Sequence, residues 1–238
     1  MEETIQSMEL AQNYKTVKEN VTKACEQAGR SEQEVTLLAV SKTKPVDMLM
    51  DVYRAGARDF GENKVQELVD KIPQMPSDVR WHMIGHLQTN KVKYLVGVVD
   101  LIESVDRLEL LECIEKQAEK VGVVQNILFE VNIGNEESKS GFTPAEAAAL
   151  AARMADFPHT ALKGLMAIPP VSEFPGENCR YFAEMRNLFV DIRAKKYDNV
   201  SMECLSMGMS DDFADAIAEG STMVRIGTAI FGKRNYNI

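Results

Sequence analysis

The chain has 238 residues, of which 45% are hydrophobic and 26% are charged, the composition of an ordinary globular protein. The net charge of −9 and the absence of a Lys/Arg-rich run argue against a nucleic-acid partner. No run of about 18 apolar residues is present, so no membrane span is predicted. The first residues also lack the basic and apolar regions of a signal peptide. We therefore expect a cytoplasmic protein.

The cysteines argue against several kinds of site. They are far apart in the chain and none has the CxxC spacing: Cys25, Cys113, Cys179 and Cys204. A zinc site, a thioredoxin-type motif and a disulfide framework are therefore not expected.

Short apolar runs alternate with segments of helical period from about residue 35 onward. Such runs, bounded by turn residues, predict the buried strands of a parallel sheet. The second run is poor in composition and is included because the spacing requires a strand there. The predicted strands are Val35–Val40, Asp59–Gly61, Trp81–Ile84, Leu101–Ser104, Asn126–Val131, Leu162–Ile168, Ser201–Ser206 and Met223–Ile230.

The segments between these runs predict amphipathic helices. Three apolar stripes have helical spacing: Val46, Leu49, Met50 and Tyr53; Leu110, Ile114, Ala118 and Val121; and Phe182, Met185, Phe189 and Ile192.

Two helix starts are also visible. Thr143 and Glu146 form a capping box around Pro144. Ser210 is predicted to cap a further helix that ends at Gly220. The stretch Pro169–Asn178 is predicted to be irregular.

Eight strand–helix units favour a closed (β/α)8 TIM barrel. A doubly wound sheet is the competing architecture, but it usually carries a Gly-rich fingerprint after its first strand, and Ser41–Pro45 has none. Residues 1–34, with Ile5, Met8, Tyr14, Val17 and Val21 among charges, predict an extra N-terminal helix on the bottom or side of the barrel. We expect one domain, 1–238, with its barrel at 35–232.

Lys42 follows the first strand directly and should emerge at the barrel mouth, where the active sites of such barrels lie. A lysine amine half enclosed in such a site can act as a nucleophile toward an aldehyde. The alternative interpretation is a solvated surface lysine.

Glycines and hydroxyls at the ends of the last two strands predict a phosphate site. Gly208 and Ser210 follow the seventh strand, and Gly227 and Thr228 lie on the eighth. Barrel phosphate sites commonly use these two loops. The alternative is that the glycines serve only turns and packing. Since Asp211 and Asp212 would repel a phosphate, their side chains should point away from it.

His82 and His86 have a spacing that could suggest a metal. On a strand, however, residues four apart are separated by about 13 Å. No HExxH motif and no GxSxG elbow is present. We expect neither a metal site nor a Ser-His-Asp triad.

The motifs of the chain, taken together, resemble those of the pyridoxal phosphate homeostasis protein family. The resemblance covers nearly the whole chain after residue 35, with the motifs in family order. They are Leu38–Thr43, Phe60–Asn63 with Val65–Glu67, Trp81–Lys91, Val131–Ile133 with Lys139–Phe142, Gly164–Met166, Leu205–Asp212 and Val224–Gly232.

This resemblance implies a barrel related to the N-terminal domain of alanine racemase, with pyridoxal 5′-phosphate (PLP) held as a Schiff base on Lys42. It also implies the residues that contact the cofactor. Ser210, Gly227 and Thr228, with Gly208 nearby, would bind the phosphate, Arg225 would face the pyridine nitrogen, Asn63 would lie near the ring substituents, and Met166 would line the pocket.

Arg225 has a consequence for the chemistry. An arginine is always cationic and disfavours a protonated pyridine nitrogen, which makes the bound cofactor a weaker electron sink. Racemisation also needs an acid–base group on each face of the ring, and Tyr236 is a poor candidate for the second one. We further expect the second domain of alanine racemase to be missing.

The sequence therefore predicts a monomeric protein that stores, buffers or delivers PLP, with PLP-dependent apo-enzymes as recipients. The alternative is an amino-acid racemase of low, broad activity. A third option is a barrel enzyme that acts on a phosphorylated metabolite without PLP.

Overall fold

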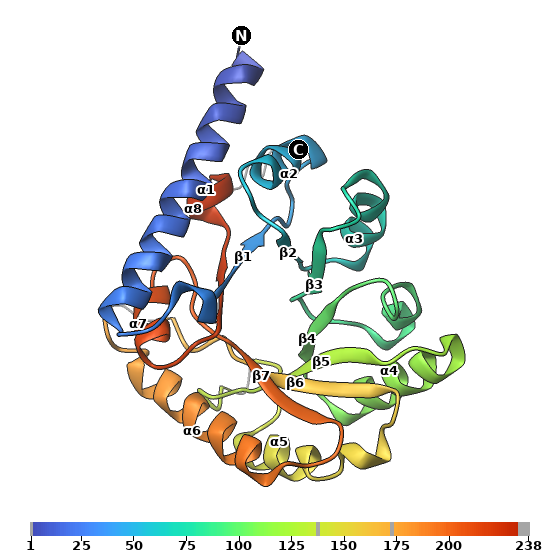
Figure 1. Ribbon diagram of the computed structural model, residues 1–238. Coiled ribbons are helices and arrows are strands. Elements are labelled where there is room, and N and C mark those ends of the chain that lie inside the picture. Colours follow the sequence, from blue (N-terminus) through green and yellow to red (C-terminus); the bar gives the residue numbers. More distant parts are fainter. Residues whose placement is uncertain (1, 137–138, 172–173, 233–238) are drawn as a thin grey trace.

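Eight parallel strands close into a barrel in the order β1 to β8 (Figure 1), as predicted. This computed structural model describes residues 2–136, 139–171 and 174–232. The strands are β1 (Thr36–Val40), β2 (Asp59–Glu62), β3 (Arg80–Met83), β4 (Leu101–Val105), β5 (Gln125–Glu130), β6 (Thr160–Met166), β7 (Val200–Ser206) and β8 (Met223–Ile226).

Helices cover the outside of the barrel. The α-helices are α1 (Glu2–Gln27), α2 (Val46–Arg54), α3 (Val65–Lys71), α4 (Leu108–Val121), α5 (Pro144–Ala151), α6 (Cys179–Lys195), α7 (Phe213–Ala218) and α8 (Thr228–Phe231). Four 3-10 helices complete the set: η1 (Glu32–Glu34), η2 (Ile72–Gln74), η3 (Thr89–Tyr94) and η4 (Met154–Asp156).

Alternation along the strands separates two kinds of core. Outward side chains such as Phe60, Ile102 and Leu205 join the large apolar layer between the strands and the helices. Leu101, Leu128 and Met166 form a separate small cluster. Several strand positions outside the apolar layer carry charged residues, and these build the polar network described below.

The N-terminal helix α1 packs on the side of the barrel against α2, α7 and α8 (Figure 1). Tyr14, Val17 and Val21 are buried there, whereas Met8 is exposed. The predicted extra helix is therefore present and belongs to the side of the barrel, although Met8 is not part of its buried face.

The largest errors in the predicted strand ends at the carboxyl end of the barrel were in β8 and β6. Strand β8 stops at Ile226, four residues before the predicted end, because Gly227 takes up helical backbone angles and α8 begins at Thr228. The apolar residue Ile230, which was included in the predicted strand, is buried in α8 instead, together with Phe231. Strand β6 ends at Met166, so Ala167 and Ile168 lie in the following loop.

The predicted cap of α7 was also wrong. The helix begins at Phe213 with Asp212 as its N-cap residue, so Ser210 does not cap it. Within α4, Val121 is 47% exposed, so it lies outside the buried face of Leu110, Ile114 and Ala118. The capping box of Thr143 and Glu146 is present as predicted.

None of the helices in the described part of the chain is long and apolar enough to span a membrane.

Candidate cofactor site at the carboxyl end of the barrel

Lys42 lies in the turn that follows β1 and is half-buried. The next residue, Thr43, has a φ of 65°, in the left-handed region that a β-branched residue rarely adopts. The N–H of Thr43 donates to Glu67 Oε2 at 2.7 Å, which holds the turn in this conformation. The backbone beside Lys42 is therefore fixed by a carboxylate from α3.

A buried cluster of charged side chains contacts the turn that carries Lys42. The Lys71 ammonium donates to the Ser41 carbonyl at 3.1 Å, to Glu62 Oε1 at 2.7 Å and to Glu67 Oε2 at 3.0 Å. The Ser41 hydroxyl donates to Glu62 Oε1 at 2.6 Å. Burial raises the pKa of Glu62 to about 7, against the opposing effect of Lys71. The cluster thus joins β1, β2 and α3 directly behind Lys42.

The predicted phosphate-binding residues gather on the neighbouring loops. Ser210 follows β7 and Thr228 follows β8, and these two strands are paired. Within the described chain, neither the backbone N–H groups of these two residues nor their hydroxyls have a hydrogen-bond partner. Unpaired N–H and O–H donors on adjacent loops are what an oxyanion requires.

Two glycines allow close packing of the backbone in these loops. Gly208 has a φ of 93°, and a Cβ there would lie 2.5 Å from the Ala216 Cβ. A Cβ at Gly227 would lie 3.1 Å from the Val40 carbonyl oxygen. Both positions therefore bring backbone into close approach, at Gly208 to α7 and at Gly227 to the end of β1.

Asp211 and Asp212 lie in the loop that carries Ser210. The Asp212 carboxylate accepts hydrogen bonds from the Met209 N–H at 2.7 Å and from the Asn178 amide at 2.9 Å. Both of its oxygens are thereby engaged, while Asp211 is exposed. Asp212 stabilises the loop that carries Ser210.

Arg225 is buried inside the barrel on β8 and has no carboxylate of the described residues in direct contact. Its guanidinium donates to Ser206 Oγ at 2.7 Å and to the Ala167 carbonyl at 2.9 Å. The Ser206 hydroxyl in turn lies 2.6 Å from Glu103 Oε2. Burial lowers the pKa of Arg225, whereas Glu103 and Glu130 act in the opposite direction. A hydroxyl therefore separates this cation from its nearest counter-charge.

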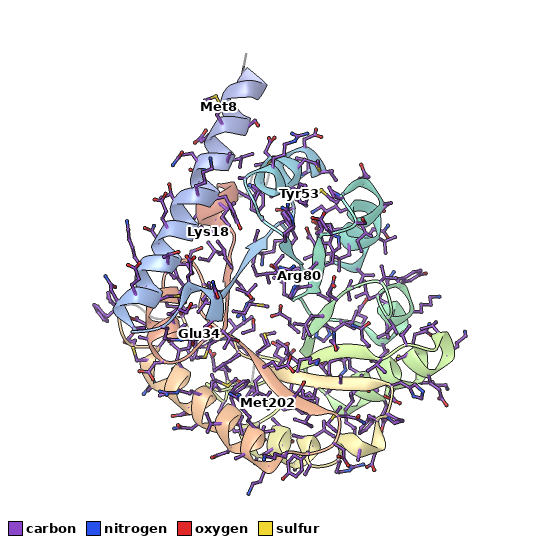
Figure 2. All side chains as sticks on the ribbon, viewed as in Figure 1. Met8, Lys18, Glu34, Tyr53, Arg80 and Met202 are labelled. Atoms are coloured by element: carbon purple, nitrogen blue, oxygen red, sulfur yellow. The ribbon has the colours of Figure 1, made fainter. Side chains whose placement is uncertain are left out.

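The same network continues toward the amino end of the barrel. His82 Nδ1 lies 2.8 Å from Glu103 Oε1, and His82 Nε2 lies 3.5 Å from Asp59 Oδ1. Asp59 also forms a two-pronged ion pair with Arg80, which lies on the barrel side of α2 and α3 (Figure 2). Burial lowers the pKa of His82, but its bonds to Asp59 and Glu103 outweigh this and raise it to about 9.

Asn63 and Met166 lie at the ends of β2 and β6. The Asn63 Oδ1 atom is buried and lacks a hydrogen-bond partner among the described residues. Met166 is buried against Leu101 and Leu128. An orphaned buried amide oxygen indicates a missing polar partner.

These observations fit a phosphorylated pyridine aldehyde. Unpaired donors at Ser210 and Thr228 suit its phosphate, the orphan Asn63 oxygen suits a polar ring substituent, and Lys42 supplies an amine for the aldehyde. No group of His, Cys, Asp and Glu among the described residues could hold a metal ion. His82 and His86 bond to different carboxylates, Glu103 and Asp106.

Sequence reasoning missed the residues that support the site. Glu103 and Ser206 hold Arg225, and Glu62 and Lys71 hold the Lys42 turn. A signal was present, because a charged residue within the apolar run Leu101–Ser104 must have a buried partner. The second acid–base candidate, Tyr236, lies outside the described residues.

Residues 12–235 match the family described as "Alanine racemase, N-terminal domain". A curated relative, the pyridoxal phosphate homeostasis protein of Aquifex aeolicus, is 45% identical over 230 residues, which cover 96% of this chain and all of the relative.

Two solved structures are also similar. A structure described as an unknown protein from Bifidobacterium adolescentis has a TM-score of 0.89 and 36% identity, covering 95% of this chain and 96% of its own. PipY of Synechococcus elongatus, in a structure with PLP bound, has a TM-score of 0.80 and 30% identity, covering 94% of this chain and 100% of its own.

The fold and the site thus define a barrel of the alanine racemase N-terminal type. Within that class, the chain belongs to the pyridoxal phosphate homeostasis protein family. The resemblance inferred from the motifs is confirmed.

Proposed function

We propose that this protein binds PLP reversibly at the barrel mouth and serves intracellular PLP homeostasis by storing, buffering or delivering the cofactor. The observation that carries the proposal is the placement of Lys42, Ser210 and Thr228 after β1, β7 and β8, with unpaired donors at Ser210 and Thr228 and with Arg225 on β8. The names and the bound PLP of the relatives support the same conclusion.

Each residue has a distinct role in this proposal. The Lys42 amine holds the cofactor covalently as a Schiff base. Ser210 and Thr228 bind the phosphate, and Gly208 and Gly227 let the backbone approach it.

The pyridine ring has its own contacts. Arg225 faces the ring nitrogen, Asn63 bonds a ring substituent, and Met166 lines the pocket. The fit of these side chains rests on the buried Arg225 guanidinium and the orphan Asn63 oxygen.

The cofactor supplies an aldehyde that condenses with an amine and a ring that can withdraw electrons. Arg225 is the residue that limits the second property. The Ser206 hydroxyl holds the cationic guanidinium beside the position proposed for the ring nitrogen, and this positive charge disfavours protonation of that nitrogen. This arrangement favours a reversible hold on the aldehyde over turnover of amino acids.

The remaining proposals concern domain organisation, localisation, oligomeric state and partners. We infer that residues 1–238 act as one domain, with a barrel at 35–232 and an extension at 1–34, and that the protein is a cytoplasmic monomer. Apo-enzymes that depend on PLP are the proposed recipients, and nucleic acid is not a partner, in line with the net charge of −9.

The experiment is transfer of PLP from the loaded protein to an apo-enzyme in the presence of a reagent that traps free PLP. Activation of the apo-enzyme despite the trap supports delivery. If the trap abolishes activation of the apo-enzyme, the protein does not deliver PLP directly and only buffers free PLP.

The racemase alternative is tested separately. Purified protein is incubated with L-amino acids, and the products are resolved by chiral chromatography. Little or no D-isomer is expected. Robust turnover that is lost in Lys42→Ala would overturn the carrier role.

A further inference from the structure

A cavity of about 230 Å³ adjoins the proposed cofactor site. It opens between the carboxyl ends of β2, β3, β5 and β6, and Asn63 lines it, so it adjoins the space assigned to PLP. Its other polar lining residues are His86, Glu130, Asn132, Lys139 and Ser140.

Glu130 is the acidic residue that lines this cavity. It is the last residue of β5 and lies two residues beyond Leu128, which packs with Leu101 and Met166. Successive strand residues alternate between faces, so Glu130 shares the face of Leu128. None of the described residues hydrogen-bonds its carboxylate, and its backbone carbonyl accepts from the Phe142 N–H at 2.9 Å.

The basic side chains beside Glu130 already have other hydrogen-bond or ion-pair partners. Lys139 donates to the Pro169 carbonyl at 3.1 Å and pairs with Glu136. His86 lies 3.0 Å from Asp106.

Arg225 donates to Ser206 and Ala167, as described above. A half-buried carboxylate whose neighbours are occupied can attract a cation that enters the cavity.

The pKa of the Glu130 carboxyl group is shifted toward neutral pH. Burial and the nearby Asp106 raise the pKa of Glu130 to about 7, while Arg225 acts in the opposite direction. A carboxylate of this kind can take up and return a proton near neutral pH.

We propose that this cavity is the entry site for a small primary amine and that Glu130 accepts the proton of its ammonium group. The inference rests on the proposed function. An amine that replaces Lys42 on the aldehyde carbon of PLP must have a free lone pair on its nitrogen. One N–H bond of the ammonium breaks, an O–H bond forms on Glu130, and the nitrogen keeps the electron pair. Glu130 later returns the proton to water.

The size of the cavity limits the occupant. A volume of about 230 Å³ accepts a free amino acid or one lysine side chain, and not a folded segment of a partner. Both sources share the primary ammonium group. Glycine and Nα-acetyl-lysine are therefore the two probes that distinguish them.

The test compares release of PLP from the loaded wild type and from Glu130→Gln, followed by absorbance. Release by glycine is expected to be about 10- to 100-fold slower in the variant, the range of general base catalysis. Hydroxylamine is largely uncharged at neutral pH and needs no proton acceptor, so its rate should not change. Glu112→Gln, an exposed substitution on α4, should match the wild type in both reactions.

The outcomes separate this inference from the proposed function. Borohydride reduction should first show equal pyridoxyl labelling of Lys42 in all three proteins, and absence of the label from every protein would refute the function instead. Equal glycine-to-hydroxylamine rate ratios in labelled wild type and variant would overturn the role of Glu130. Dependence on Glu130 for only one of the two amines identifies that amine as the occupant.

A second measurement uses the unloaded wild type and requires no variant. Carbon-13 NMR of the Glu130 carboxyl group should show a pKa that falls when ethylammonium is added, because a bound ammonium stabilises the carboxylate. An unchanged titration at saturating ethylammonium would contradict the proposed amine site.

Discussion

Arg225 contacts its nearest counter-charge only through Ser206, whose hydroxyl lies 2.7 Å from the guanidinium and 2.6 Å from Glu103. A direct carboxylate contact would offset the positive charge of the guanidinium and occupy its donors. The hydroxyl fixes the side chain while two of its five N–H groups are bonded to described residues.

Removal of this hydroxyl should weaken PLP binding. Ser206→Ala leaves a buried Arg225 donor without an acceptor, and we expect about tenfold lower affinity, equivalent to about 1.4 kcal/mol. Fluorescence titration with PLP measures the change. Ser221→Ala is the matched control, because Ser221 is a buried serine whose hydroxyl bonds backbone carbonyls and not Arg225. Equal affinities of the two variants would show that Ser206 does not position Arg225.

His82 should make the protein less stable as the pH rises from about 7 to 9. Its pKa of about 9 in the folded protein exceeds the ordinary value of 6.5. The stabilisation is therefore complete below the unfolded value and is lost as the pH rises through the folded value. We expect a loss of about 1–3 kcal/mol over this window, measured by urea unfolding. His82→Gln should lack this part of the pH dependence, and an unchanged slope would rule out the assignment.

Lys71 should be required for stability behind the Lys42 turn. Lys71→Met leaves the buried Glu62 carboxylate without its counter-charge, and breaking such a pair costs about 3–5 kcal/mol. The double variant Lys71→Met with Glu62→Gln should recover part of this loss, since the uncompensated charge is gone. Denaturant unfolding of the three proteins provides the comparison. No recovery in the double variant would contradict a charge-based role.

Gly208 should tolerate alanine far less well than another glycine with positive φ. Gly29 has a φ of 67° and open space where a Cβ would lie, so Gly29→Ala reports the backbone strain alone, about 1–2 kcal/mol. Gly208→Ala adds a clash with Ala216 and should also reduce PLP affinity. Thermal unfolding and PLP titration give the two readouts. Similar stabilities would mean that α7 moves aside without cost.

The strand order could be predicted from the sequence because eight apolar runs recur with helices between them. The end of β8 could not be predicted in this way. Apolar residues such as Ile230 and Phe231 fit a buried strand and equally fit a helix that packs against the core. A serine followed by two acidic residues, as at Ser210, is likewise typical of a helix N-cap. In the structure, however, Asp212 is the N-cap residue of α7. Local pattern does not decide between such alternatives; tertiary packing does.

The residues that contact the proposed cofactor were predicted from motifs, but their supporting partners were not. Glu103 and Ser206 are about a hundred residues apart in the chain and meet only when β4 and β7 close into the barrel. Glu130 gave no signal beyond its place at a strand end. Its relevance arises from the cavity beside it and from the absence of a hydrogen-bond partner in the described chain.

The central claim is that Lys42 holds PLP covalently, and borohydride reduction tests it most directly. The loaded protein is reduced, digested and analysed by peptide mass spectrometry. We predict one pyridoxyl group on Lys42, with loss of the visible absorbance in Lys42→Ala. A label on another lysine such as Lys44, or an unmodified Lys42 in fully loaded protein, would contradict the account.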